Sequence, residues 1–280
     1  MERKKITVGS VIIFVILLIT AFVFLIPFLW TFLTSIKTDP EIYSSTVTIL
    51  PTVVTFDNYV HVLTKMGNFV KYFSNSLVVT FWSVLFTVIL SATMGYSFSK
   101  MDFKFRNVYM GFVLFILTLP YVIYLIPIYL MQSKVDLIDT RLGLILPYIA
   151  TNLPMAIFIM RGQFNNVPNE LSEAAIIDGC NIWQVFQRVV MPCVKPGTAT
   201  VIIFTFINVW GEYTFARTLT STSAAQTLPV GITFLRDEAA SWQYGTLTAT
   251  ITMSLIPLLA IFLSMQKYFI KGIMEGALKG

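Results

Sequence analysis

Charged residues divide this chain into six long stretches that contain none of them, and this spacing limits what the chain can fold into. The stretches without Lys, Arg, Asp or Glu are Ile6–Ile36, Tyr72–Ser99, Asn107–Ser133, Leu142–Met160, Pro196–Gly211 and Ala239–Gln266. A helix that crosses a bilayer needs about 20 apolar residues, because each residue adds about 1.5 Å across a core of about 30 Å. We therefore predict an all-α integral membrane protein with six transmembrane helices.

The six stretches predict one transmembrane domain that covers residues 1–280. The fifth stretch is the shortest, so its helix must continue past Glu212 to about Thr220. The first stretch is longer than the apolar region of about 7–15 residues in a signal peptide, which predicts an uncleaved helix. The predicted spans are about 10–33, 72–97, 107–131, 142–161, 198–220 and 246–267.

Prolines occur in pairs within two of these stretches, Pro120 with Pro127 and Pro147 with Pro154. A proline removes a backbone donor and bends a helix, and membrane helices tolerate this where neighbours satisfy the backbone. Each pair is equally consistent with ordinary helix curvature and with a bent helix that lines a gated pathway.

Composition and charge exclude several classes of protein. The chain is 56% hydrophobic and 12% charged, whereas soluble domains average about 25% charged residues. Its net charge of +5 comes without a basic cluster interleaved with aromatic residues, so nucleic acid is not an expected partner. Cys180 and Cys193 lie in one connection expected to face the reducing cytosol, and His61 cannot form a metal site alone.

The basic residues predict the orientation in the membrane. If the N-terminus is inside, 12 of the 19 Lys and Arg residues lie in inside segments and the other seven lie outside. This imbalance favours two cytoplasmic termini. The outside segment 37–71 is then long, and its turn-forming and apolar residues predict a structured loop on the outer membrane surface.

The inside connection at residues 165–192 predicts two short helices joined by a tight turn. Pro168 suits the first turn of a helix, Glu170 and Glu173 suit its positive end, and Gly179 can adopt the left-handed conformation that ends it. Spacings of three and four place Leu171, Ala174 and Ala175 on one face. This small face favours docking into a groove of a partner, and a hairpin lying on lipid headgroups is the alternative.

Several kinds of chemistry have no counterpart in this chain. It lacks the G-x-x-x-x-G-K-[ST] phosphate loop and has no pattern typical of a catalytic or metal site, so we do not expect an enzyme. No predicted span has a charged residue near its centre, and the one exception, Glu212, lies toward the outer end of the fifth span. Charged residues near the centre of a span usually mark ion pathways. We therefore predict a neutral solute and an energy source on another chain.

A twenty-residue segment identifies a family. Glu173–Gly179 resembles the E-A-A-x-x-D-G signature of permease subunits in binding-protein-dependent ATP-binding cassette (ABC) importers. Val189–Pro192 follows at the family's spacing and is similar to its I-x-L-P ending. The segments Thr55–Tyr59, Trp210–Tyr213 and Gln266–Gly280 are similar to the carbohydrate branch, specifically its maltose-type second permease. Gly211 departs from the Asn that is common there.

This resemblance implies a type I ABC importer permease fold and a set of partners. These are a second homologous permease, two ATPase subunits that hold ATP and Mg²⁺, and an extracytoplasmic sugar-binding protein. It places the chain in a bacterial inner membrane with no cofactor of its own, moving a sugar, preferentially a di- or oligosaccharide. The outer loop at about 217–244 would face the binding protein. The residues implied to contact an ATPase are Glu170, Leu171, Glu173, Ala174, Ala175, Asp178 and Gly179, with Gly276, Lys279 and Gly280 in the tail 268–280.

Four uncharged polar or aromatic residues of the fourth and fifth spans, together with Glu212, are candidates for a sugar pathway. They are Asn152, Asn208, Trp210, Glu212 and Tyr213. For each of them, helix packing or anchoring at the membrane interface is the competing interpretation. Two other functions stay open, a permease for another small solute and a secondary transporter that works alone.

Overall fold

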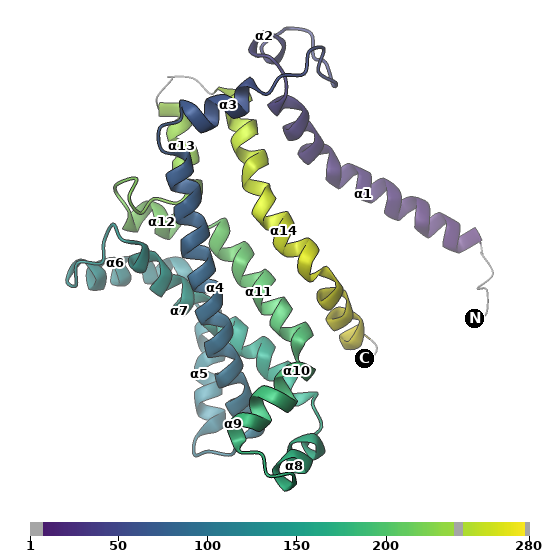
Figure 1. The fold of residues 1–280 in the computed structure, drawn as a ribbon, viewed down its shortest axis with the longest axis vertical. Coiled ribbons are helices and arrows are strands. Elements are labelled where there is room, and N and C mark those ends of the chain that lie inside the picture. The colour runs from purple at the N-terminus through teal and green to yellow at the C-terminus, as the bar shows by residue number, and fades with distance from the viewer. Residues whose placement is uncertain (1–7, 238–242, 278–280) are drawn as a thin grey trace. The chain divides into compact units, whose positions relative to one another are not determined.

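The computed structural model describes residues 8–237 and 243–277, and within these ranges all regular structure is helical (Figure 1). The chain divides into two compact units, Met1–Gly67 with Ile232–Leu255 and Asn68–Gly231 with Ile256–Gly280. The helices α13 (Leu228–Asp237) and α14 (Tyr244–Ala277) each contribute to both units.

The described helices include four that are long and apolar enough to cross a membrane. They are α1 (Val8–Ser35), α4 (Phe69–Lys100), α7 (Arg141–Asn165) and the Tyr244–Tyr268 part of α14. Two bent helix pairs pass the same test, Arg106–Thr118 with Tyr121–Ser133 and Ile182–Cys193 with Lys195–Trp210. The described residues therefore contain up to six candidate spans if each bent pair counts as one.

The first unit holds α1, α2 (Asp39–Ile42) and α3 (Asp57–Thr64), and polar contacts order the segment after α1. Glu41 accepts hydrogen bonds from the Thr48 hydroxyl at 2.6 Å and the Thr52 amide at 3.0 Å. The side chain of Asn58 donates to the carbonyl oxygens of Ser35 at 3.0 Å and Lys37 at 2.9 Å. The segment predicted as a structured outer loop thus contains two short helices and a polar network.

The core of the second unit is built on α4, α7 and α11 (Lys195–Trp210). At Gly95 a Cβ atom would lie 2.8 Å from the Cβ of Met160 and 3.0 Å from the amide of Arg161, so α4 and α7 approach closely there. The buried face of α4 carries small polar residues, which suit close packing of membrane helices. These are Ser76, Thr80, Ser83, Thr87 and Ser91.

Residues 107–131 do not form the single helix that their lack of charge predicted. The segment consists of α5 (Arg106–Thr118), the 3₁₀ helix η1 (Tyr121–Tyr124) and α6 (Leu125–Ser133), with a bend of 97°. Pro120 has no amide hydrogen, and the preceding Leu119 is extended at φ −87° and ψ 130°. By contrast, Pro147 and Pro154 both lie inside an uninterrupted α7.

The predicted span 198–220 is also interrupted. Helix α11 ends at Trp210, and α12 (Thr214–Leu219) starts after a break at residues 211–213. The break brings the charged side chain of Glu212 out of the helical pattern and to the start of α12, where backbone amides are available to it.

Candidate functional site

Four short elements form the 165–192 segment: α8 (Asn169–Ile177), α9 (Ile182–Gln184), the π-helix η2 (Val185–Val190) and α10 (Met191–Cys193). Pro168 precedes α8, and Gly179 ends it at φ +87°, as its sequence predicted. Asn181 and Gln184 form a reciprocal capping box at the start of α9, with both hydrogen bonds at 2.9 Å. The local sequence therefore builds the tight hairpin.

One side of α8 packs against its own chain. Ala175 is only 7% exposed and belongs to a hydrophobic cluster with Tyr96, Phe164 and Phe186. The rings of Tyr96 and Phe164 meet edge to face at 5.7 Å, and those of Tyr96 and Phe186 lie 5.0 Å apart. This corrects the prediction that Ala174 and Ala175 share a face open to a partner, because Ala175 is buried in this cluster of its own chain.

The other side of α8 is exposed. All predicted contact residues of this segment other than Ala175 are exposed, and they are Glu170, Leu171, Glu173, Ala174, Asp178 and Gly179. The neighbouring Ile177 is 86% exposed, and Ile182 and Trp183 at the start of α9 are also exposed. The segment thus presents carboxylates together with large apolar side chains, a combination suited to contact with another protein.

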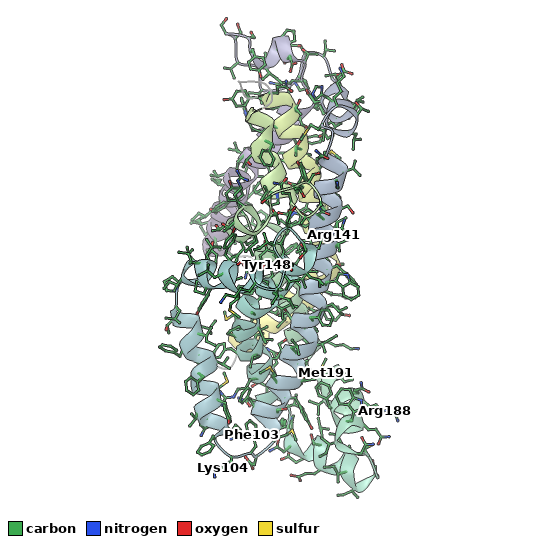
Figure 2. The ribbon with its side chains drawn as sticks, turned by 90° about the vertical axis from the view of Figure 1, so that its left-hand side faces the viewer. Phe103, Lys104, Arg141, Tyr148, Arg188 and Met191 are labelled. Carbon is green, nitrogen blue, oxygen red and sulfur yellow. The ribbon has the colours of Figure 1, made fainter. Side chains whose placement is uncertain are left out.

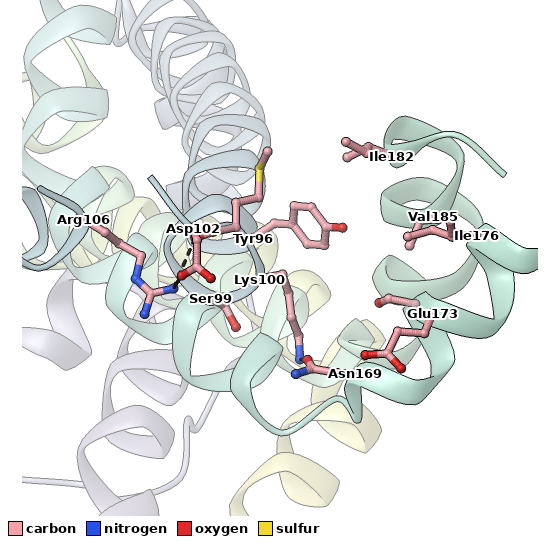
Figure 3. Close-up of a pocket in the computed structure, with 12 residues that line it drawn as sticks. Tyr96, Ser99, Lys100, Asp102, Arg106, Asn169, Glu173, Ile176, Ile182 and Val185 are labelled. Atoms are coloured by element: carbon pink, nitrogen blue, oxygen red, sulfur yellow. Dashed lines mark hydrogen bonds and ion pairs between the residues drawn. The ribbon is translucent and has the colours of Figure 1, made fainter. Parts of the chain in front are cut away.

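A cavity of about 550 Å³ lies between α8 and the end of α4 (Figure 3). Glu173 and Ile176 line it from α8, and Lys100 and Arg106 line it from the opposite wall. The ammonium of Lys100 donates to the carbonyl oxygen of Val167 at 2.5 Å and to the side-chain oxygen of Asn169 at 2.7 Å. These hydrogen bonds attach the start of α8 to the end of α4.

A second cavity of about 510 Å³ lies at the break between α11 and α12. It collects four of the predicted pathway residues: Asn152 comes from α7, Asn208 comes from α11, and Glu212 and Tyr213 come from the break itself. Trp210 does not line it. Its ring is 8% exposed, stacks on Phe206 at 5.6 Å and meets Phe73 edge to face at 5.7 Å, so Trp210 has a packing role.

Hydrogen bonds fix the polar wall of this cavity. Glu212 accepts from the Tyr148 hydroxyl at 2.6 Å and from the amides of Phe215 at 2.8 Å and Ala216 at 3.1 Å. The side-chain nitrogen of Asn208 donates to the side-chain oxygen of Asn152 at 3.1 Å. The carboxylate of Glu212 is therefore already satisfied by its own chain, and Asn208 is held in one orientation.

Sequence reasoning missed Tyr121 and Tyr148, which also line this cavity. Tyr148 lies seven residues after Arg141 on α7, in a buried position that periodicity alone would assign to packing. Tyr121 reaches the cavity because the chain turns sharply at Pro120. Figure 2 places Tyr148, which lines this cavity, well apart from Phe103 and Lys104, which directly follow Met101 and Asp102 of the first cavity, so the two cavities lie at different levels of the second unit.

The start of the predicted outer loop 217–244 is tied to the connection between α6 and α7. Asp139 accepts hydrogen bonds from the amides of Ser221 at 2.9 Å and Thr222 at 3.0 Å and from the Thr222 hydroxyl at 2.6 Å. Burial raises the pKa of Asp139, but these hydrogen bonds outweigh it and hold the pKa below its ordinary value of 3.8. Residues 238–242 of this loop lie outside the described ranges.

The predicted contacts of the C-terminal tail fall largely outside the described residues. Helix α14 continues through Gly276 to Ala277, whereas Lys279 and Gly280 are not described. Within the described ranges, no group of three or more His, Cys, Asp or Glu residues could hold a metal ion.

Known proteins resemble this chain over nearly its full length. It is 29% identical over 282 residues to the arabinooligosaccharides transport system permease protein AraQ of Halalkalibacterium halodurans, covering 100% of both chains. It is 32% identical to the trehalose transport system permease protein SugB of Mycobacterium tuberculosis, covering 91% of this chain and 93% of that one.

The fold matches a chain from the crystal structure of a bacterial ABC transporter involved in the import of the acidic polysaccharide alginate. The TM-score is 0.80 at 24% identity, with 96% of this chain and 99% of that chain covered. The profile of the family described as binding-protein-dependent transport system inner membrane component matches residues 87–275, which include both cavities and the 165–192 segment. The chain therefore belongs to the family of inner membrane components of binding-protein-dependent transport systems.

Proposed function

We propose that this chain is a permease subunit of an ATP-driven importer that receives a sugar from an extracytoplasmic binding protein and moves it into the cytoplasm. The names of relatives that cover nearly the whole chain, which refer to arabinooligosaccharides and to trehalose, support a di- or oligosaccharide. The family membership supports the binding protein as a partner.

The observation that carries this proposal is the exposed side of α8. Glu173 and Leu171 are exposed there, Ile177 beside them is 86% exposed, and Gly179 closes the hairpin in the left-handed conformation. In this proposal an ATPase subunit covers these residues and Glu173 is the main polar anchor. ATP and Mg²⁺ bind to the ATPase subunits, and this chain carries no cofactor.

The opposite side of α8 supports transmission of movement. Ala175 belongs to one buried cluster with Tyr96 of α4 and Phe164 of α7, and Lys100 of α4 donates hydrogen bonds to Val167 and Asn169. A displacement of α8 would therefore move the ends of α4 and α7 together with it, because close-packed interiors transmit strain. Two states of the ATPases can then bias two states of the membrane helices.

The remaining partners and the topology belong to the same proposal. A second, homologous permease completes the pathway through the bilayer, and the C-terminal tail with Gly276, Lys279 and Gly280 reaches the ATPases. The chain lies in a bacterial cytoplasmic membrane with both termini inside. The distribution of 19 basic residues, with 12 in the inside segments, supports this orientation.

An experiment on the assembled transporter tests this proposal. The chain is produced with its partner subunits, and Glu173→Ala and Gly179→Val are compared with the wild type for ATPase copurification and ATP-dependent sugar uptake into vesicles. Asp57→Ala is a matched control, because Asp57 is also an exposed acid near the start of a short helix. We expect both variants, but not the control, to lose ATPase or uptake while the chain remains in the membrane.

Unchanged assembly and transport in both variants would contradict the docking role. A secondary transporter that works alone would then become the better account of this chain. A permease for another solute would instead show normal docking and a different substrate.

A further inference from the structure

The cavity at the break between α11 and α12 has the size and the surface of a site for a small polar molecule. Its volume of about 510 Å³ falls in the range of about 300–1,000 Å³ that is usual for small-molecule sites. Tyrosine rings and side-chain amides line it, and none of its lining residues is Lys, Arg or His. Its single acid, Glu212, already accepts three hydrogen bonds from its own chain.

Two breaks in the membrane helices meet at this cavity. Tyr121 directly follows the break at Pro120, and Glu212 and Tyr213 lie in the break that begins at Gly211. Non-helical backbone at membrane depth is tolerated where it is buried in protein or lines a water-filled cavity. Interrupted helices are also a recurrent feature of solute sites in transporters.

The groups left available in the cavity are those that suit a sugar. The nitrogen of the Asn208 amide is used by Asn152, which leaves its oxygen to accept from a hydroxyl group. Tyr213 is 42% exposed and Tyr121 is 47% exposed, so both rings can cover an apolar face of a sugar ring. A tyrosine offers an apolar face and a polar hydroxyl on one rigid side chain.

The charge of the cavity distinguishes between sugars. A carboxylate on the sugar would lie beside Glu212 without a cation from this chain to compensate it. Two like charges held close together without a counter-charge repel each other. An uncharged sugar avoids this repulsion and can still exchange hydrogen bonds with the amide and phenol groups.

We propose that this cavity is a saccharide subsite on this subunit that selects uncharged over acidic sugars, with Asn208 accepting from a hydroxyl and Tyr121 and Tyr213 stacking on the ring. The inference rests on the proposed function, which it extends from a permease that moves a sugar to one that binds it directly. Glu212 and Tyr148 are positioning residues, because they hold the break at which Tyr213 lies.

The test uses the complete transporter in proteoliposomes with a panel of trisaccharide probes. Maltotriose and arabinotriose are uncharged, and trigalacturonate is acidic. We expect ATP-dependent uptake of at least one uncharged probe and none of trigalacturonate. For that uncharged probe, Asn208→Ala and Tyr213→Ala should raise the KM about tenfold, which corresponds to about 1.4 kcal/mol, with little change in the maximal rate. Tyr213→Phe keeps the ring and should have a smaller effect.

Tyr129→Ala is the matched control, because Tyr129 is 41% exposed on α6 and does not line the cavity. ATP hydrolysis and the size-exclusion profile of each complex report whether a variant is assembled. A merely structural role of Asn208 or Tyr213 would lower assembly or the maximal rate and leave the KM unchanged.

An unchanged KM in the Asn208 and Tyr213 variants, while wild-type uptake proceeds, would overturn the subsite and leave the proposed function intact. Uptake of trigalacturonate as fast as that of the uncharged probes would overturn its selectivity. A wild-type complex that hydrolyses ATP with its binding protein and takes up none of the probes would contradict the proposed function and the subsite together.

Discussion

The hydroxyl of Tyr148 on α7 donates a hydrogen bond of 2.6 Å to Oε2 of Glu212, which lies between α11 and α12. The same carboxylate accepts from the amides of Phe215 and Ala216 in α12. One acidic side chain thus joins α7 to α12 and satisfies amides that an interrupted helix leaves free. Hydrogen bonds to a charged acceptor are stronger than those between neutral groups. Loss of this contact should therefore destabilise the second unit.

We predict that Tyr148→Phe destabilises the chain. The variant keeps the ring and removes only the donor to Glu212, and a hydrogen bond to a charged group contributes about 1.5–3 kcal/mol. Thermal unfolding of the purified complex in detergent should therefore show a lower melting temperature. Tyr121→Phe is the control, because its hydroxyl makes only a long contact of 3.5 Å to an uncharged group, the hydroxyl of Thr214. Equal melting temperatures for Tyr148→Phe and the wild type would show that the contact contributes nothing.

We predict that Gly179→Ala weakens the coupling between this chain and its ATPase without causing a steric clash. A Cβ at Gly179 would meet nothing within 4 Å, but its φ of +87° is unfavourable for any residue with a side chain. The left-handed conformation costs such a residue about 1–2 kcal/mol. ATP-dependent uptake should fall and more ATPase should dissociate during purification.

Gly162→Ala provides the comparison, because this glycine also has free space around it and lies inside α7. Alanine is favoured over glycine in a helix, so this variant should be as active and at least as stable as the wild type. An equal loss of uptake in both variants would argue against a special role of the turn.

Lys100→Met should separate ATP hydrolysis from transport. The substitution removes the hydrogen bonds that hold Val167 and Asn169 to the end of α4 but leaves the exposed side of α8 intact. We expect normal ATPase copurification and a severalfold lower ratio of sugar taken up to ATP hydrolysed. Lys104→Met is the control, since the ammonium of Lys104 lies over the ring of Phe105 at 5.1 Å. An unchanged ratio in Lys100→Met would remove this contact from the transmission of movement.

The contacts of Asp139 should be insensitive to pH over the neutral and mildly acidic range. Its pKa in the folded chain is below 3.8, so its ionised form stabilises the fold above the ordinary pKa, and this stabilisation is lost only as the pH falls through the lower, folded-state value. Hydrogen exchange of residues 220–227, corrected for intrinsic rates, should stay constant from pH 7 to about pH 5. Asp139→Asn should increase this exchange at every pH. Exchange that rises already between pH 7 and pH 5 in the wild type would contradict the lowered pKa.

The sequence was informative where a local rule determines the structure. Charged residues at Lys100 and Arg141 mark the ends of two long helices, and Gly179 adopts the left-handed turn expected of it. The capping box of Asn181 and Gln184 could also have been predicted, because both residues stand at the required spacing.

The sequence was less informative where distant segments decide the outcome. Pro120 interrupts its helix and Pro147 does not, because the neighbouring segments determine which bend is accommodated. Ala175 and Leu171 share a face by spacing, yet only Ala175 is buried in the hydrophobic cluster, and Leu171 is 43% exposed. The π-helix at Val185–Val190 has no signal in its sequence. Tyr121 joins the second cavity only as a consequence of the bend at Pro120.

The central claim is that this chain moves sugar at the expense of ATP hydrolysed by a partner. The most direct measurement is uptake of a labelled uncharged trisaccharide by proteoliposomes that contain the complete complex, with binding protein outside and with or without ATP inside. We predict uptake that requires ATP and the binding protein, that persists without an ion gradient, and that is lost in Glu173→Ala. Uptake by the chain alone, driven by a proton gradient in the absence of ATP, would contradict this account and identify a secondary transporter.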